Sequence, residues 1–167
     1  VFMTSGTQSN LAALMAHCGR GDEYLAGMEA HCYLHEQGGA AWLGSIQPQP
    51  IPHEADGTLA LSAIAAAIKP DDMHYARTRL LALENTLGGR VIPLTYLNEA
   101  TALAKGRGLG THLDGARMFN AVVASNTDAA AMARPFDTIS VCLSKGLGAP
   151  VGTVLVAVLA GAPAGAL

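Results

Sequence analysis

A lysine and an aspartate each follow directly on a short apolar segment. Lys145 lies in the string S-K-G-L-G after the segment Thr138–Leu143, and Asp114 follows the segment Gly110–Leu113. Short apolar segments of this kind are typical of buried strands. Open α/β sheets place their ligands at the carboxyl ends of such strands. The spacing therefore predicts that an amine and a carboxylate meet at one edge of a parallel sheet.

An amine and a carboxylate in this arrangement suit the chemistry of pyridoxal 5'-phosphate (PLP). The amine of Lys145 would form a Schiff base with the aldehyde, and the carboxylate of Asp114 would keep the ring nitrogen protonated, so that the ring accepts electrons. Spacing alone leaves a second interpretation open, because a buried structural ion pair and a separate surface lysine would give the same pattern.

A third segment adds a possible phosphate site. The residues Thr4–Asn10 read T-S-G-T-Q-S-N and come immediately before a helical pattern. Small hydroxylated residues at the start of a helix offer free N–H groups and the positive end of the helix dipole, which together bind phosphate. Ordinary N-capping explains the same residues when the segment is taken alone. Together with Asp114 and Lys145, the segment favours the PLP interpretation.

Strand-like and helix-like segments alternate along the chain, which predicts an α/β fold. We expect a mostly parallel sheet with helices on both faces. The connection between the last two strands is too short for a crossover helix, so Gly152–Val158 is expected to be the one antiparallel strand. Pro48 and Pro50 indicate that Ile46–Ile51 is an edge strand or a loop. The other expected strands are Glu23–Ala26, Arg79–Glu84, Gly110–Leu113 and Thr138–Leu143, and the expected helices are Leu11–Cys18, His31–Ala41, Leu61–Ile68, Leu94–Lys105, Arg117–Ala124 and Ala129–Arg134.

Composition narrows the class of protein further. The 167 residues suffice for one domain, 14% of them are charged, and the net charge is −3. No basic run indicates a nucleic-acid partner, and no apolar stretch is long enough to span a membrane. The three cysteines are widely separated, which is typical of buried thiols in a reducing compartment and not of a disulfide framework or a zinc site. We therefore expect a cytoplasmic protein without a metal.

Five strings carry a resemblance to a known family. They resemble, in order and spacing, the low-specificity L-threonine aldolases, which are fold-type I PLP enzymes grouped with the β-eliminating lyases. The resemblance runs from about Phe2 to Val156. The strings are S-G-T-Q-S-N-L, A-H-C-Y-L-H-E-Q-G-G-A, L-E-N-T-L-G-G-R-V-I-P, H-L-D-G-A-R-M-F-N-A and L-S-K-G-L-G-A-P-V-G.

The resemblance implies a role for each of several residues. Lys145 resembles the Schiff-base lysine and Asp114 the partner of the pyridine nitrogen. Arg117 resembles the arginine that helps to hold the substrate carboxylate. His31 resembles the histidine that stacks on the cofactor ring, and Glu36 the glutamate that orders a water near the reacting hydroxyl. Two further residues, Gly6 and Thr7, resemble phosphate ligands. On residue type alone, His31 could equally be a partly buried histidine, and Arg117 a surface arginine in an ion pair.

One position departs from the family. Many of its members carry a histidine after Glu-Asn-Thr that contacts the substrate's β-hydroxyl, and Leu87 stands there in this chain. His112 is no evident replacement, since it is expected to lie in a strand off the face that bears Asp114. The catalytic base is therefore assigned to His31 or to a water ordered by Glu36. Glu84 and Asn85 stay secondary candidates, for cofactor contact or merely for the following turn.

The resemblance also predicts an activity and a domain. It implies cleavage of L-threonine or L-allo-threonine to glycine and acetaldehyde by a homo-oligomer. Residues 1–156 would form the PLP-binding large domain, incomplete at both ends, and residues 157–167 a tail unlike the family. The chain expressed alone is then expected to be inactive. The alternatives are another PLP-dependent β-eliminating lyase or a non-catalytic fragment.

Overall fold

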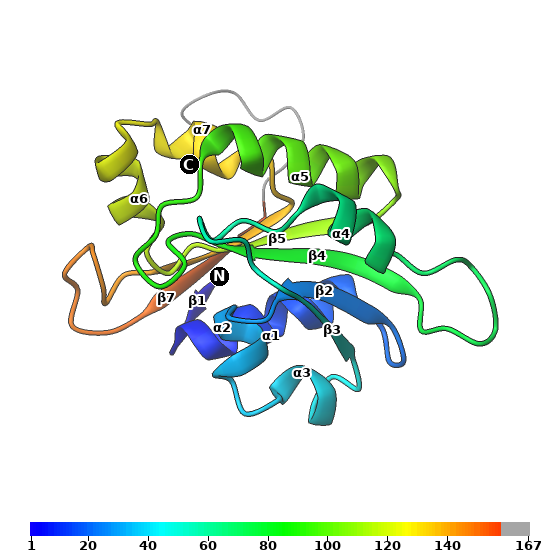
Figure 1. Ribbon diagram of the computed structural model, residues 1–167. Coiled ribbons are helices and arrows are strands. Elements are labelled where there is room, and N and C mark those ends of the chain that lie inside the picture. The colour runs from blue at the N-terminus through cyan, green and yellow to red at the C-terminus, as the bar shows by residue number, and fades with distance from the viewer. Residues whose placement is uncertain (158–167) are drawn as a thin grey trace.

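The computed structural model describes residues 1–157, which form one seven-stranded sheet with helices on both faces (Figure 1). The strand order is β1-β7-β6-β5-β4-β2-β3. The strands are β1 (Phe2–Met3), β2 (Glu23–Gly27), β3 (Gln47–Ile51), β4 (Thr78–Glu84), β5 (Gly110–Asp114), β6 (Thr138–Cys142) and β7 (Thr153–Ala157). The helices are α1 (Gly6–His17), α2 (His31–Leu34), α3 (Gly39–Trp42), α4 (Leu61–Ala67), α5 (Leu94–Gly106), α6 (Met118–Ser125) and α7 (Ala129–Ala133).

The strand directions confirm the predicted fold class. Strands β3, β2, β4, β5 and β6 pair in parallel, whereas β7 pairs antiparallel with both β6 and β1. Strand β7 is therefore the one reversed strand of the sheet. It turns back directly from β6 through the loop that contains Lys145, so no crossover helix is needed there.

Each face of the sheet is covered by its own set of helices. Helices α1, α2 and α3 lie on one face and α4 to α7 on the other (Figure 1). Residues of β4 alternate between the two layers, because successive side chains of a strand point to opposite faces. Leu81 and Leu83 join the apolar cluster under α4 to α7, and Leu80 and Ala82 join the cluster under α1 to α3.

The predicted helix His31–Ala41 is wrong, because two short helices occupy this segment. Helix α2 ends at Leu34 and α3 begins at Gly39. Between them, Gln37 and Gly38 have left-handed backbone angles, with φ of 55° and 65°. A right-handed helix cannot continue through such residues. Glu36 therefore lies on a turn and not on the helix that carries His31.

Smaller differences concern where elements begin and end. Helix α1 begins at Gly6, so much of the segment Thr4–Asn10 lies inside the helix rather than before it. Strand β3 lies at the edge of the sheet, as its two prolines indicated. Val158, the expected end of the last strand, and nearly all of the expected tail 157–167 lie outside the described residues.

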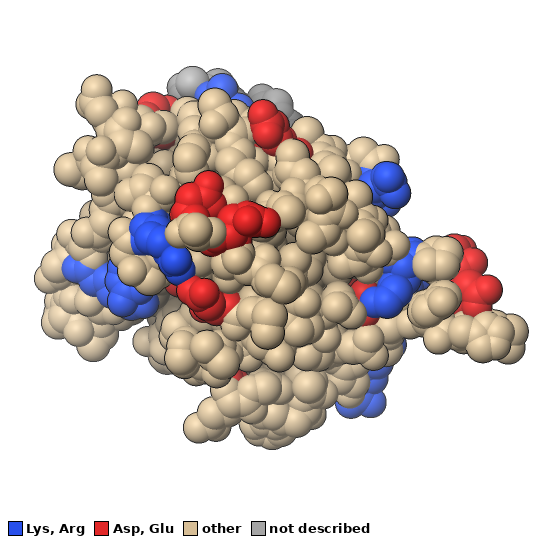
Figure 2. Space-filling model, viewed as in Figure 1, with Lys and Arg blue, Asp and Glu red and all other residues tan. Residues whose placement is uncertain are grey.

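The surface of the described chain carries both signs of charge. Figure 2 shows acidic and basic side chains lying side by side on one face, without a broad field of either sign. Within residues 1–157, no helix has the length and apolar character that crossing a bilayer requires.

Candidate active site

Two acidic residues end neighbouring strands at the carboxyl edge of the sheet. Glu84 is the last residue of β4 and Asp114 the last of β5, and they are direct register partners. On the other side of β5, Asp114 is the register partner of Ser140 in β6. The residues that precede Glu84 in β4 and Asp114 in β5 are mostly apolar and buried, so both strands lie in the core. The sheet therefore delivers the two carboxyl groups side by side at the edge where ligands bind in open α/β folds.

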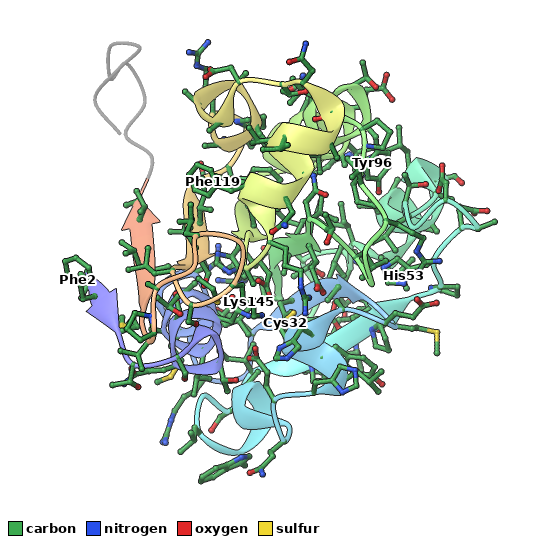
Figure 3. The ribbon with its side chains drawn as sticks, turned by 90° about the vertical axis from the view of Figure 1, so that its left-hand side faces the viewer. Phe2, Cys32, His53, Tyr96, Phe119 and Lys145 are labelled. Carbon is green, nitrogen blue, oxygen red and sulfur yellow. The ribbon has the colours of Figure 1, made fainter. Side chains whose placement is uncertain are left out.

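Lys145 lies on the loop between β6 and β7, beside the start of α1. The loop folds tightly, with Gly148 N–H donating to the carbonyl of Lys145 at 3.0 Å. A side chain at Gly146 would collide with the side-chain oxygen of Asn120 on α6, so a larger residue there would require Asn120 to move. Figure 3 shows Lys145 near the centre of the molecule, next to the ribbon of α1. The lysine thus comes from a loop with a defined conformation.

Lys145 is distinct from the two other lysines of the chain. The amine of Lys69 bonds to Glu23 at 2.7 Å, and the amine of Lys105 to Asp137 at 3.0 Å. Among residues 1–157, no acceptor bonds to the amine of Lys145. Lys145 instead lines a cleft of 330 Å³ together with His31, Cys142 and the segment Thr4–Thr7. Its amine is therefore the one that can reach a ligand in this cleft.

The amino end of α1 faces the same cleft. Ser5 caps the helix, since its hydroxyl accepts from Gln8 N–H at 3.2 Å. The first N–H groups of any helix have no acceptor inside the helix. A Cβ at Gly6 would come within 3.1 Å of Cys142 Sγ, so only glycine fits without a shift of that side chain. Ser5 therefore acts as an N-cap, while Gly6 and Thr7 line the cleft at the amino end of α1.

Asn10 joins two carboxyl groups below this helix end. Its side-chain amide donates to Asp114 Oδ2 at 2.7 Å and to Glu36 Oε1 at 2.9 Å. Glu36 Oε1 also lies 2.9 Å from His31 Nδ1. Possible ligand atoms of His31, Glu36 and Asp114 all lie within 4.8 Å of one another, a spacing that would suit a metal ion. Both amide hydrogens of Asn10 point to this group, so an amide holds the carboxyl groups together.

Burial raises the pKa of two glutamates at this edge, Glu36 and Glu84. Burial raises the pKa of Glu36, although its bonds from Asn10 and His31 oppose the shift. Burial, followed by the negative charge of Asp114, raises the pKa of Glu84 to about 7. Glu84 Oε2 accepts from the backbone N–H of His31 at 2.9 Å. Perturbed groups of this kind gather at functional sites, although structural networks perturb pKa values too.

His31 and Arg117 both lie at the edge that carries Asp114. The side chain of His31 is 39% exposed and lines the cleft with Lys145. Its ring centre lies 5.6 Å from that of His35, which is thereby placed next to the site. Arg117 is exposed at the start of α6, and none of the salt bridges found in residues 1–157 includes it. Its positive charge opposes the rise in the pKa of Glu84, which puts it on the same side of the molecule.

The fold settles the secondary candidates. Asn85 turns inward, where its amide bonds to the backbone N–H and carbonyl of Ile92, both at 3.1 Å. It therefore shapes the following turn. Leu87 is 2% exposed and belongs to the apolar cluster under α4 to α7, so it does not reach the cleft. Glu84, in contrast, belongs to the site through His31.

Sequence reasoning missed two residues of the polar network. Asn10 was assigned only to the phosphate segment, yet its side chain contacts both carboxyl groups. His112 was wrongly placed off the face of Asp114. Residues two apart in a strand share a face, and His112 Nε2 lies 3.2 Å from Asn10 Oδ1. The alternation of β5 was the available signal for His112, and no sequence signal marked Asn10.

The donor set of the cleft fits PLP. The space is narrow at Gly6, where a side chain would approach Cys142, as expected where a phosphate lies against backbone. It holds one uncommitted amine, that of Lys145, and a buried carboxylate, Asp114, lies at the end of a neighbouring strand. Aldehyde, ring nitrogen and phosphate would each have a chemically suitable partner here.

Comparison with known proteins places this arrangement in a family. The family model described as beta-eliminating lyase matches residues 1–159. The chain belongs to the beta-eliminating lyase family. The family resemblance predicted from the five strings is thereby confirmed.

Several relatives in this family are named as threonine aldolases. The chain is 56% identical to the low specificity L-threonine aldolase of Escherichia coli (strain K12) over 156 residues, which is 93% of this chain and 47% of that protein. It is 41% identical to the low specificity L-threonine aldolase of Saccharomyces cerevisiae, covering 93% of this chain and 41% of that one. A threonine aldolase structure from Leishmania major superposes with a TM-score of 0.83 at 27% identity, over 93% of this chain and 46% of that one. The chain thus spans about half the length of the curated relatives it matches.

Proposed function

We propose that this chain forms part of a PLP-dependent aldehyde-lyase that cleaves L-threonine or L-allo-threonine to glycine and acetaldehyde. The observations that carry the proposal are the cleft shared by Lys145 and the amino end of α1, and the Asp114 carboxylate at the end of β5, which accepts from Asn10 of the same helix. The 56% identity to a low specificity L-threonine aldolase supports the choice of substrate. When bound, PLP supplies an electrophilic aldehyde and a ring that accepts an electron pair.

The residues divide the work of binding this cofactor. Gly6 and Thr7 would bind the phosphate with the free N–H groups of α1. Asp114, buried at the end of β5, would hold a proton on the ring nitrogen. Lys145 would provide the amine that holds the aldehyde. His31 would cover the ring, and its backbone N–H bond to Glu84 and its Nδ1 contact to Glu36 fix its position.

The remaining residues act on the amino acid. Arg117 binds the substrate carboxylate. His31, or a water that Glu36 orders, takes the proton of the β-hydroxyl, within about 2.6–3.2 Å or through one water. When Nδ1–H of His31 donates to Glu36, its Nε2 is left with a lone pair for this proton. Loss of the proton lets Cα–Cβ break, acetaldehyde leaves, and a proton added at Cα completes glycine.

We place this site in a larger assembly. Residues 1–156 form the cofactor-binding domain, and the full-length protein is a homo-oligomer, which the exposed Phe2 and Trp42 support at 80% and 67% exposure. Figure 3 has Phe2 at the rim of the sheet, away from Lys145. The three buried, unpaired cysteines support a reducing compartment such as the cytoplasm.

The test is a product assay on the full-length protein with added PLP. L-Threonine and L-allo-threonine are supplied separately, and acetaldehyde and glycine are measured together. The proposal expects both products in equal amounts, with the activity lost in the Lys145→Ala variant. Cysteine and tryptophan serve as comparison substrates. Release of pyruvate and ammonia from these, without glycine from threonine, would assign the protein to another β-eliminating activity.

A further inference from the structure

Helix α1 packs on the sheet through two polar residues in addition to the apolar Ala13 and Leu14. Ser9 and Asn10 are its most buried polar residues, at 0% and 1% exposure. The strands beneath α1 also carry polar residues at this contact. They are His112 of β5 and Thr138 of β6, which are register partners. A helix normally buries an apolar stripe. Unpaired buried polar groups are costly, so a polar contact of this kind needs a compensating set of hydrogen bonds.

The contacts of Asn10 fix the orientation of its side-chain amide. The Nδ2 atom lies 2.7 Å and 2.9 Å from oxygens of Asp114 and Glu36, and a carboxylate can only accept. The NH₂ group must therefore face the two carboxyl groups, and Oδ1 must face His112. Since Oδ1 is an acceptor, Nε2 of His112, at 3.2 Å, carries a hydrogen.

The same reasoning continues away from the cleft. Burial lowers the pKa of His112 to about 4, so its ring is neutral at neutral pH and Nδ1 is an acceptor. The hydroxyl of Thr138 lies 2.9 Å from Nδ1 and donates to it. This hydroxyl in turn accepts from Nε2–H of His17, also at 2.9 Å. The hydrogen bonds therefore run in one direction along the chain His17–Thr138–His112–Asn10: each residue donates to the next. Asn10 then donates to the two carboxyl groups.

We propose that Asn10 is a positioning residue, which Thr138 and His112 orient and which holds the carboxylates of Asp114 and Glu36 in place for the cofactor. The inference rests on the proposed PLP function. Asn10 contacts neither cofactor nor substrate and acts through the groups on both sides of the ring site. Its Asp114 bond sets the carboxylate that meets the ring nitrogen, and its Glu36 bond sets the glutamate that orients His31.

Two physical effects make this contact important for the reaction. A short hydrogen bond orients the carboxylate that accepts it, so the amide of Asn10 holds Asp114 Oδ2, at 2.7 Å, in one position beside Glu36. The amide also fixes the distance between Asp114 and Glu36. A displacement of about 1 Å in a reacting group can cost about 10²-fold in rate.

The experiment compares Asn10→Leu and Asn10→Asp with the parent in the full-length protein. Leucine keeps the volume but removes the donors, and aspartate replaces the donors with a third negative charge. Asn98→Asp, on the exposed face of α5, is the matched control. Both Asn10 variants are expected to lower kcat about 10²-fold with KM for threonine changed less than about 3-fold. Asn98→Asp is expected to match the parent.

Two readouts do not depend on turnover. In histidine-labelled parent protein, ¹⁵N NMR is expected to show His112 as the neutral Nε2–H tautomer with and without PLP. In the Asn10 variants, the pH at which the absorption of bound PLP changes is expected to shift by about one unit from the parental value, because the amide no longer holds the Asp114 carboxylate in place. Parent-like kcat and parent-like absorption in folded Asn10→Leu would overturn the proposal. If Asn10→Leu does not fold, the kcat and PLP absorption of Asn10→Asp and the kcat of Thr138→Val test the proposal instead.

Thr138→Val is nearly isosteric and removes only the hydroxyl that orients His112. It is expected to mix the two neutral tautomers of His112 and to lower kcat several-fold. An unchanged tautomer together with unchanged kcat would refute the orienting chain. Failure of the parent itself to bind PLP at Lys145 would instead refute the proposed function, so the two failures are distinguishable.

Discussion

Buried or half-buried glutamates occur at both ends of the parallel strands, and their partners differ. At the amino end, Glu23 begins β2 with 0% exposure, and the amine of Lys69 lies 2.9 Å and 2.7 Å from its two carboxylate oxygens. Gln47 and Thr78 also donate to it, at 2.9 Å and 3.0 Å. At the carboxyl end, Glu36 and Glu84 receive only amide, imidazole and backbone donors.

The two clusters differ in how many donors, and which kinds of donor, their carboxyl groups receive. A buried carboxylate with a cation and two further donors has a partner on each of its oxygens, so its position is fixed. At the carboxyl edge, three carboxyl groups share few donors and their charges oppose one another. There the pKa of Glu84 rises to about 7, so a proton can be held or released near neutral pH. On the proposed function, the amino end of the strands contributes stability and the carboxyl end contributes the chemistry.

The largest expected effect is on activity at the carboxyl edge. Asp114→Asn in the full-length protein should lower kcat/KM for threonine by about 10²- to 10³-fold, the range seen when one electrostatic group at a reacting centre is removed. The fold should persist, because asparagine can still accept from Asn10. Steady-state kinetics and thermal unfolding measure the two properties separately. Parental turnover by Asp114→Asn would remove Asp114 from the mechanism.

Glu23→Gln should show the opposite division of effects. Removing one partner of a buried ion pair leaves Lys69 without its counter-charge and should lower the free energy of unfolding by about 3 kcal/mol. The kinetic constants of the folded enzyme should stay at parental values. Urea unfolding and assays at low temperature test this prediction. An unchanged free energy of unfolding, or a large loss of kcat, would erase the contrast between the two ends.

Glu84→Gln should stabilise the protein above pH 7. The pKa of Glu84 is about 7 in the folded chain against 4.5 for an unperturbed glutamate. Between these values the folded state binds more protons than the unfolded state, so the free energy of unfolding falls as pH rises from about 4.5 to 7. Glutamine removes this fall and should add about 2 kcal/mol at pH 8. Unfolding curves at pH 5 and pH 8 measure the effect, and equal loss of stability in parent and variant over this interval would contradict it.

The smallest expected effect concerns the helix cap at the phosphate site. Ser5→Ala removes the acceptor of Gln8 N–H and should cost about 1 kcal/mol of stability. It should weaken PLP binding only slightly, because Gly6 and Thr7 keep their backbone N–H groups. Ser125→Ala at the end of α6 provides a comparison that leaves the cleft untouched. A much larger loss of PLP affinity in Ser5→Ala would make the Ser5 hydroxyl itself a phosphate ligand.

The sequence predicted the sheet well because the strands rest on local patterns. Apolar segments that end in Asp114, or lead into Lys145, mark buried strands, and parallel connections bring their carboxyl ends together. The reversed strand β7 followed from a connection too short to hold a helix. The break after α2 was missed because the left-handed angle of Gln37 has no signature in residue type, although Gly38 did weaken the helical pattern.

The polar network was harder to predict, since it joins residues far apart in the sequence. Asn10 meets Glu36 and Asp114 only because α1 lies across β5. An asparagine near a helix start is most simply explained by capping, and nothing local indicates two carboxylate partners. The error over His112 was avoidable, because strand alternation alone places it on the face of Asp114.

The central claim is that the carboxyl edge, and not the ion-paired end, carries the cofactor chemistry. Borohydride reduction of the full-length protein with PLP, followed by peptide mapping, tests this most directly. Of the three lysines in the chain, Lys69 is bound by Glu23 and Lys105 by Asp137. The phosphopyridoxyl group is therefore expected on Lys145. A label on Lys69 or Lys105, with Lys145 unmodified, would contradict the account.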